Sequence, residues 1–531
     1  MLATIFRKVV DSRVAPPVFS TERHSTQHTQ PDWKRVEVIP LFRLAHVCQR
    51  WRSAALADAA LWSHVDVSYP EVAVRFFLQC SSGYPLTLYA SAEKASLAEK
   101  ILEDHGARVR AVYLDRKHDE AATTAHRRAF QLGGHYQFHH GAAQFFAATP
   151  VNAGPPPILG PSSHFLDMAT SQLAFHHFCS RAPQLECFAL RQLKLGPGPL
   201  PFFGPDRGLS HIPSNSPLKA LALHLSEAYF PKNSFPNLTH LSLSFPLRPS
   251  GNEGREKNLL EMLSRTPQLQ FLQLSNLRTL TASPYEFVIG VPQVLPYPQV
   301  SLDHLRLLAF SGVQPEAAFN LLKYLTLPQS VLLSIECAEG SNLLNNGLPP
   351  SLRIPPIVQL NAATFMEISI STAFDEILLT GYDALITSGF LFRTRNHRNF
   401  WTTTWLPQLH TMMTLSGITV LHINDNDGLV LPHLLPHFTQ LEELSILLLP
   451  AMQGEAAMVR TARALFANLT PLTMLVCPAL HFLGLEADIG HEAFPYAELH
   501  AMAIWRSQWG CAIRPLRIPL AWEPDAMARS L

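Results

Sequence analysis

The sequence has few charged residues and no excess of either sign. Charged residues make up 15% of the 531 positions, and 41 acidic residues balance 41 basic ones. Nucleic-acid binding depends largely on a basic field, which this chain lacks. No apolar run is long enough to cross a bilayer, since the richest runs, such as residues 444–449, have the length of a strand. We therefore expect neither nucleic acid nor a membrane among the partners.

Cysteine is scarce, and the familiar motifs of catalysis are missing. The seven cysteines are odd in number, widely scattered and mostly set in apolar surroundings. This pattern is typical of reduced core residues in an intracellular protein, cytoplasmic or nuclear, rather than of a disulfide framework. No GxSxG, Walker-type glycine loop or GxGxxG occurs. The sequence therefore predicts that the chain is not an enzyme and needs no cofactor.

Histidine, by contrast, is abundant, with 25 residues. Those within residues 135–140, and His433 with His437, could be considered as metal ligands. No HExxH or paired cysteine accompanies them, and Pro436 interrupts a helix at the second place. Surface or capping histidines are the preferred interpretation, so no metal is predicted. An enzyme of unrecognised type with a histidine-containing site is the weakest alternative.

What the chain does contain is a repeated apolar triplet with the spacing LxxLxL. The last two apolar residues of each copy are two positions apart and therefore point to the same side of a short strand. Stacked copies bury a core that no single copy could bury alone. The ten copies begin at Val109, Leu185, Leu218, Leu238, Leu269, Leu302, Leu322, Ile418, Leu441 and Leu480.

Helix-like pieces lie between the triplets. NLLEMLSR before Thr266 and RALFANL before Thr470 present apolar residues at helical intervals and stop near a proline. The fold predicted for residues 69–531 is therefore α/β, an irregular leucine-rich-repeat-like solenoid of helix-turn-strand units with a parallel sheet. Residues 343–400 contain no clear triplet and are expected to hold an insertion or drifted repeats. Residues 1–30 are predicted to be a disordered leader.

Residues 41–68 combine a helical stripe, a tryptophan pair and a strand. After Pro40, apolar residues recur at three- and four-residue spacing, which predicts an amphipathic helix. Residues 64–68 alternate with period two, as in a half-buried strand. The residues of the stripe are Leu41, Leu44, Val47, Cys48, Trp51 and Ala55, and the pair that follows is Leu61 and Trp62.

This segment resembles an F-box, in the divergent form of large fungal families, where a VCxxWRxxA helix and an LW pair precede a leucine-rich-repeat-like domain. The resemblance makes residues 31–68 a partial F-box-like helical segment. It implies a substrate receptor that docks on a Skp-type adaptor of a cullin-RING ubiquitin ligase and holds a target protein. The adaptor-binding residues that it implies are Leu44, Val47, Cys48, Trp51, Leu61 and Trp62.

The repeats predict where a target protein would bind. Strand residues that flank the buried triplet positions point to the opposite side of the sheet, where repeat proteins bind their partners. Their mixed polar and aromatic character suits protein recognition. The target-binding residues predicted in this way are Tyr113, Arg191, His240, Phe271, Gln273, Arg306, Tyr324, His422 and Glu443.

A second function stays open at this point. Members of the F-box family begin with an LPxE-type segment and a first helix, whereas this chain has residues 31–37, PDWKRVE, in that place. The alternative is a leucine-rich-repeat scaffold that binds proteins without any connection to a ligase.

Overall fold

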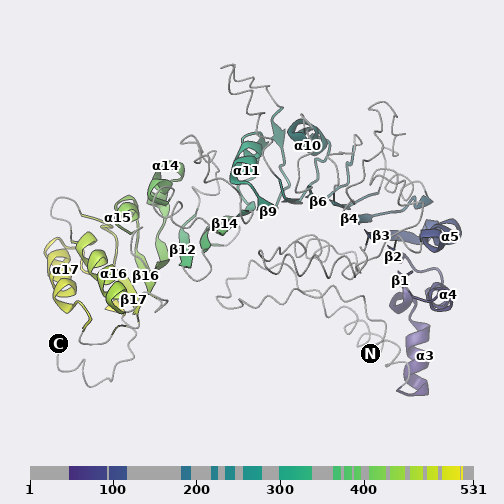
Figure 1. Ribbon diagram of the computed structural model, residues 1–531, viewed down its shortest axis with the longest axis horizontal. Coiled ribbons are helices and arrows are strands. Elements are labelled where there is room, and N and C mark those ends of the chain that lie inside the picture. Colours follow the sequence, from purple (N-terminus) through teal and green to yellow (C-terminus); the bar gives the residue numbers. More distant parts are fainter. Residues whose placement is uncertain are drawn as a thin grey trace, which may run out of the picture. The chain divides into compact units, whose positions relative to one another are not determined.

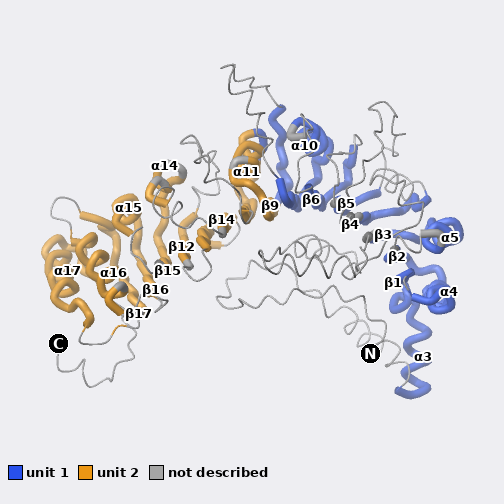
Figure 2. The backbone as a smooth tube through the Cα atoms, viewed as in Figure 1, with its two compact units in different colours: residues 1–305, 324–326 blue, residues 306–323, 327–531 orange. Residues whose placement is uncertain are grey.

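The computed structural model divides the chain into two compact units (Figure 2). Unit 1 comprises residues 1–305 and 324–326, and unit 2 comprises residues 306–323 and 327–531. The residues that the structure describes are 47–67, 69–91, 95–116, 181–192, 217–224, 234–245, 255–277, 298–337, 363–371, 376–385, 388–395, 406–425, 431–448, 455–470, 475–487, 489, 493–514 and 516–517.

Unit 1 is built on parallel strands that follow one another in space as they do in the sequence. Their order is β1-β2-β3-β4-β5-β6-β7, and each neighbouring pair is parallel. Figure 1 shows helices α4, α5 and α10 along one side of these strands. Strands β8 and β10 form a separate parallel pair.

The elements of unit 1 are α3 (Gln49–Ala57), η1 (Ala59–Trp62), β1 (His64–Asp66), α4 (Glu71–Cys80), β2 (Leu86–Ser91), α5 (Ala95–His105), η3 (Gly106–Arg108), β3 (Val109–Arg116), β4 (Cys187–Gln192), β5 (Ala220–His224), β6 (His240–Ser244), α10 (Arg255–Ser264), β7 (Phe271–Ser275), β8 (Val300–Ser301) and β10 (Leu325–Thr326).

Unit 2 has the strand order β9-β11-β14-β13-β12-β15-β16-β17-β18. Strand β13 runs antiparallel to both β12 and β14, and the other neighbouring pairs are parallel. Figure 2 shows α14, α15, α16 and α17 on one side of β12, β15, β16 and β17.

The elements of unit 2 are β9 (Leu307–Val313), α11 (Pro315–Leu322), β11 (Leu332–Cys337), β12 (Phe365–Ser371), β13 (Glu376–Tyr382), β14 (Gly389–Arg395), η7 (Leu406–Gln408), α14 (Leu409–Met412), η8 (Leu415–Gly417), β15 (Val420–Asp425), α15 (Leu431–Leu434), η9 (Leu435–His437), β16 (Glu443–Leu448), α16 (Glu455–Asn468), β17 (Phe482–Ala487), α17 (Tyr496–Gln508) and β18 (Leu516–Arg517). A mixed α/β fold with a large, mostly parallel sheet is thus confirmed.

A buried turn precedes most of the triplet strands. The backbone N–H of the first triplet residue donates to the carbonyl three residues earlier, with N···O distances of 2.9–3.4 Å. The residue that accepts is itself buried, so each turn adds a side chain to the core. The donor and acceptor pairs are Leu185 and Ala182, Leu238 and Phe235, Leu269 and Thr266, Leu305 and Leu302, Ile418 and Leu415, Leu441 and Phe438, and Leu480 and Cys477.

The predicted helix-turn-strand order is clearest around β7. Helix α10 ends at Ser264, the turn runs from Thr266 to Leu269, and the strand starts at Phe271. Thr266 also donates its hydroxyl to the carbonyl of Leu263 at 2.8 Å, which satisfies a helix-end carbonyl. The proline after Thr266 therefore falls where the helix has already stopped.

One triplet is predicted in the wrong register, and another lies outside the main sheet. The triplet at Leu302 predicts a strand carrying Leu305 and Leu307, but β9 starts at Leu307, and its buried residues are Leu308, Phe310 and Val313. The turn explains the shift, because Leu305 donates to Leu302 and so takes the place of a first triplet residue. The triplet at Leu322 leads only to the two-residue strand β10, outside the main sheet.

Residues 343–400, where no triplet was found, contain the antiparallel strand. A glycine allows its close pairing: a Cβ at Gly381 would lie 2.4 Å from the ring of Phe390, its partner residue on β14. In β12, Met366, Ile368 and Ile370 are buried, and the position three residues before Met366, which a leucine occupies in most triplets, is held by the small Ala363, also buried. An LxxLxL search therefore misses it.

One buried charge supports the turn before β17. Arg506 on α17 is fully buried. Its guanidinium donates to the carbonyls of Val476 at 2.9 Å, Cys477 at 2.8 Å and Leu480 at 3.3 Å, and to that of Cys511 at 3.1 Å. One side chain thus satisfies four backbone acceptors, of which those of Val476, Cys477 and Leu480 are buried.

Replacing Arg506 by methionine should lower the free energy of unfolding of unit 2 by about 3 kcal/mol or more, because several buried carbonyls lose their donor. Urea unfolding measures the change. The matched control is Arg463→Met: that guanidinium pairs with Glu498 at 3.0 Å on the exposed surface, and its loss should cost about 1 kcal/mol or less. Equal effects of the two substitutions would contradict the role given to Arg506.

Candidate functional site

Helix α3 carries the accessible part of the predicted adaptor-binding segment. Val47, just before the helix, is 61% exposed, Cys48 is exposed, and Trp51 is partly exposed. Leu44 lies outside the described residues. Within the helix itself only Ala55 is buried. Apolar side chains are therefore presented to solvent at the start of α3.

The helix begins later than the apolar stripe predicts. Cys48 has an extended backbone, with φ −160° and ψ 168°, and precedes the first helical residue, Gln49. Its carbonyl accepts from the N–H of Arg52 at 3.0 Å, but its side chain makes no capping hydrogen bond. Val47 and Cys48 thus lie before the helix, not on its apolar side, because an extended residue cannot continue the helical hydrogen-bond pattern.

Leu61 and Trp62 serve the protein's own core. Trp62 is 1% exposed, and Leu61 is also buried. The indole Nε1–H donates to the carbonyl of Ala55 at 2.8 Å, and the ring contacts Phe76 and Phe77 at centroid distances of 5.2 and 5.8 Å. Both side chains, which the F-box resemblance assigns to an adaptor, are covered here, and Trp62 holds α3 against α4.

Strand residues that alternate with the buried triplet residues point to the opposite side of each sheet. This side is called here the far face of the sheet. In unit 1 this face is buried. Tyr113 is 1% exposed, and His240 and Gln273 are buried as well, whereas Phe271 is partly exposed. Arg191 falls in β4, and its side chain lies outside the described part of the chain. The expectation that this face is open to a partner therefore fails at Tyr113, His240 and Gln273.

Small apolar residues surround Tyr113 on this face. Tyr113 stacks on Tyr89 at 5.1 Å, and Cys187 donates a weak hydrogen bond to the Tyr113 hydroxyl at 3.7 Å. Burial raises the pKa of both tyrosines well above the usual value and that of Cys187 to about 12, so all three groups remain neutral. Ala111, Ala189, Ala220 and Ala222 complete this cluster, which is a second apolar core.

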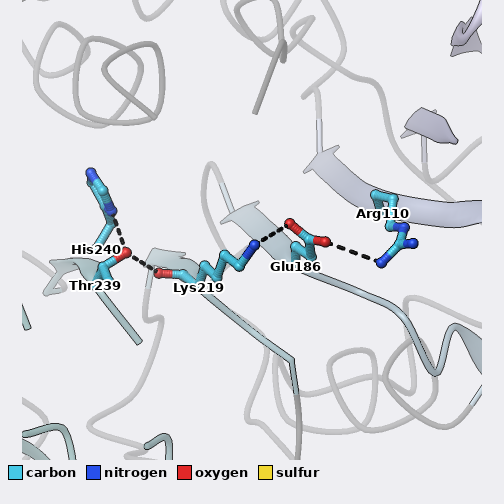
Figure 3. A network of polar contacts seen from close by, with 5 residues as sticks. All are labelled: Arg110, Glu186, Lys219, Thr239 and His240. Atoms are coloured by element: carbon cyan, nitrogen blue, oxygen red, sulfur yellow. Dashed lines mark hydrogen bonds and ion pairs between the residues drawn. The ribbon is translucent and has the colours of Figure 1, made fainter. Parts of the chain in front are cut away.

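A ladder of polar contacts joins the beginnings of successive strands of unit 1 (Figure 3). Glu186 accepts from Arg110 at 3.0 Å and from Lys219 at 2.9 Å. Thr239 donates its hydroxyl to the carbonyl of Lys219 at 3.1 Å and lies 2.8 Å from Nδ1 of His240. The ladder fixes neighbouring strands in register along the rim of the far face.

His240 links this ladder to the far face. Its ring stacks on Phe271 at a centroid distance of 4.3 Å. Burial lowers the pKa of His240 to about 4, because a charged imidazole would lose its hydration there. The histidine is therefore a neutral structural residue at physiological pH.

The free energy of unfolding of unit 1 should decrease as the pH is lowered, because of His240. The pKa of His240 is lower in the folded than in the unfolded state, so the unfolded chain binds the extra proton as pH drops from about 6.5 towards 4. The contribution is complete above pH 6.5 and is lost by up to about 1.4 kcal/mol per pH unit below it.

Urea unfolding of His240→Gln between pH 8 and 4.5 should show a shallower dependence of the unfolding free energy on pH than unfolding of the parent chain. Desolvation lowers the pKa of His64 to about 4 as well, so part of the slope stays. An unchanged slope would contradict the assignment.

The far face of unit 2 is more open. His422 on β15 and Glu443 on β16, both predicted from the triplets, lie together, with 3.7 Å between Nε2 and Oε1. The side chains of both are partly exposed. Arg306, before β9, is exposed, whereas Tyr324 belongs to unit 1 and is partly exposed. The structure thus brings two of the predicted residues into one contact on an accessible surface.

The neighbours of His422 were not found from the sequence. Phe365 on β12 contacts the His422 ring edge-on at 4.9 Å and stacks on Tyr382 at 5.9 Å. Glu367 is the register partner of His422 on the adjacent strand. These residues lie in the stretch without triplets, where only the period-two alternation of residues 365–371 could have indicated a strand with Phe365 and Glu367 on the same side.

Comparisons with known proteins add no relative. No protein-family model matches the chain, and no curated protein matches it at the required significance. Within the described ranges, no helix has both the length and the apolar character needed to cross a bilayer. The described side chains include no group of three or more histidine, cysteine, aspartate or glutamate residues arranged to hold a metal ion. The functional argument therefore depends on the exposed surfaces of the chain itself.

Proposed function

We propose that this protein is an F-box-type substrate receptor that recruits a target protein to a cullin-RING ubiquitin ligase. In this proposal residues 31–68 are a partial F-box-like segment, and the parallel strands with their buried turns are an irregular leucine-rich-repeat-like solenoid. The chain itself performs no chemistry. It raises the local concentration of target lysines near the ubiquitin donor, and the ligase and its conjugating enzyme transfer the ubiquitin.

The observation that carries the proposal is the exposure of apolar residues around α3. Val47 and Leu56 are exposed, and Ala55 is the buried residue of this nine-residue helix. Isolated helices of this length are marginal in water, and their stability comes from packing an apolar side against a partner. A Skp-type adaptor that covers Val47, Cys48 and Trp51 would supply that packing.

The alternative is a leucine-rich-repeat scaffold without a ligase connection. One observation favours it: Leu61 and Trp62 are buried within unit 1 and are not available to an adaptor. An adaptor contact would then depend on the beginning of α3 and on the residues that precede it.

Replacing Val47 by aspartate should reduce capture of a purified Skp-type adaptor at least tenfold, because a carboxylate would have to be desolvated in an apolar contact. Trp51→Ala should have the same effect. Pull-down followed by calorimetric titration measures both. Since Val47 is exposed, its replacement leaves the fold intact.

Val72→Asp is the matched control. Val72 lies on α4 of the same unit and is 80% exposed, so the chemical change is the same at an exposed site outside α3. Its adaptor affinity should equal that of the parent chain. Full adaptor binding by Val47→Asp and Trp51→Ala would remove this mode of docking, and no binding by the parent chain would favour the scaffold.

A further inference from the structure

The far face of unit 1 is buried although most of its side chains are small. Ala111, Cys187 and Ala220 are 0% exposed, and the rings of Tyr89 and Tyr113 are each 1% exposed. Alanine and cysteine are too short to cover the tyrosine rings beside them, and two rings stacked on one another leave an outer side open. Atoms from another part of the protein must therefore lie over this face.

Unit 2 provides the comparison. Ala309, Ser334 and Ser445 occupy equivalent positions on its strands, and each is partly exposed. In unit 1, Ala220 and Ser242 are buried. The side chains are of similar size in the two units, so the difference in exposure does not come from these residues themselves.

The described helices of unit 1 do not supply the cover. Helices α4, α5 and α10 lie along one side of the strands (Figure 1). The buried cluster on the far face, which includes Tyr113 and Ala222, consists of strand residues alone in the part of the chain that the structure describes. The cover therefore comes from residues outside the described ranges.

The first residues of the chain carry an apolar stripe of their own. Leu2, Ile5, Phe6 and Val9 recur at spacings of three and one to three, on one side of an expected amphipathic helix. They belong to the predicted disordered leader of residues 1–30, which lies outside the described ranges. A short amphipathic helix is marginal in water unless its apolar side packs against a partner. The stripe thus requires an apolar surface of the kind that the far face of unit 1 offers.

Length and charge suit this pairing. The buried cluster spans β2 to β5, three strand spacings or about 14 Å. A helix of residues 2–10 would also be about 14 Å long. Asp66, the register partner of Tyr89 on β1, is a buried carboxylate at one end of the same face, and Arg7 and Lys8 bring the opposite charge.

We propose that residues 2–10 form an amphipathic helix that covers the far face of unit 1, with Phe6 and the rest of the apolar stripe packed on Tyr89 and Tyr113. The beginning of the chain is then part of the folded unit and not a leader. The inference goes beyond the proposed function, because it holds for a ligase receptor and for a scaffold alike. It leaves this face unavailable to a target protein.

Photo-crosslinking in the full chain tests the position of the segment. p-Benzoylphenylalanine in place of Tyr113 should, on irradiation, crosslink to the tryptic peptide of residues 1–7, which mass spectrometry identifies. A mixture of isotope-labelled and unlabelled chains distinguishes crosslinks within one chain from those between two copies. The control carries the same residue in place of Phe482, which is partly exposed on β17, and should give no crosslink to this peptide.

The accessibility of Cys187 gives a second measurement, without a probe on the face itself. Phe6→Asp places a carboxylate in the apolar stripe, so iodoacetamide should alkylate Cys187 at least tenfold faster than in the parent chain. Thr4→Asp is the matched control, because it adds the same charge on the polar side of the expected helix. Its rate should stay within twofold of the parent. Far-UV circular dichroism of the three chains should agree, which excludes unfolding of unit 1.

A crosslink from position 113 to residues 1–7, together with faster alkylation in Phe6→Asp alone, supports the inference. A crosslink to residues 117–180, to any other segment or only to a second copy would overturn it. The absence of any crosslink, or equal alkylation rates in Phe6→Asp and Thr4→Asp, would overturn it as well.

Discussion

The buried turn that precedes most of the triplet strands is the constraint on which the rest of the structure depends. Its N–H to carbonyl bond, as between Leu441 and Phe438, fixes where the chain leaves the helical layer and becomes extended. The strand starts two residues after the donor, at Glu443 in this example. The carbonyl of the intervening residue, Glu442, accepts from the N–H groups of His481 and Phe482 in the following repeat. One local turn therefore sets both the start of its own strand and the register of its neighbour.

The sequence predicts this architecture where the signal is local. Hydrophobic spacing revealed the strands that follow Leu185 to Leu269 and Ile418 to Leu480, because a buried turn residue and two buried strand residues must all be apolar. It failed at Leu302, since both turn positions there are leucine and spacing alone cannot tell which one opens the triplet. It also missed β12, whose leading triplet position is the small Ala363, and β13, which pairs antiparallel with its two sequence neighbours, β12 and β14.

The two far faces show a limit of pattern reasoning of another kind. A triplet fixes which strand residues face its core, but not whether the opposite side is covered. In unit 1 the positions beside Tyr113 are held by alanine and Cys187, which offer nothing that must stay hydrated, so the face can be buried without unpaired charge. In unit 2 the equivalent positions carry Glu367, His422 and Glu443, whose burial would be costly. The sequence shows these side chains, but the triplet pattern alone predicts an open far face for both units.

The same difference would affect how tightly and how reversibly a substrate receptor binds its target. A surface that holds a target for ubiquitin transfer must release it afterwards, and partly exposed ion pairs are individually weak and sensitive to salt. Partly exposed glutamates suit such reversible contact better than a broad apolar face, which would also attract unrelated proteins. The apolar area that unit 1 could have offered is used internally by Tyr89, Tyr113 and their small neighbours. The backbone register of β12, β15 and β16 would hold the polar side chains of such a surface at a fixed spacing.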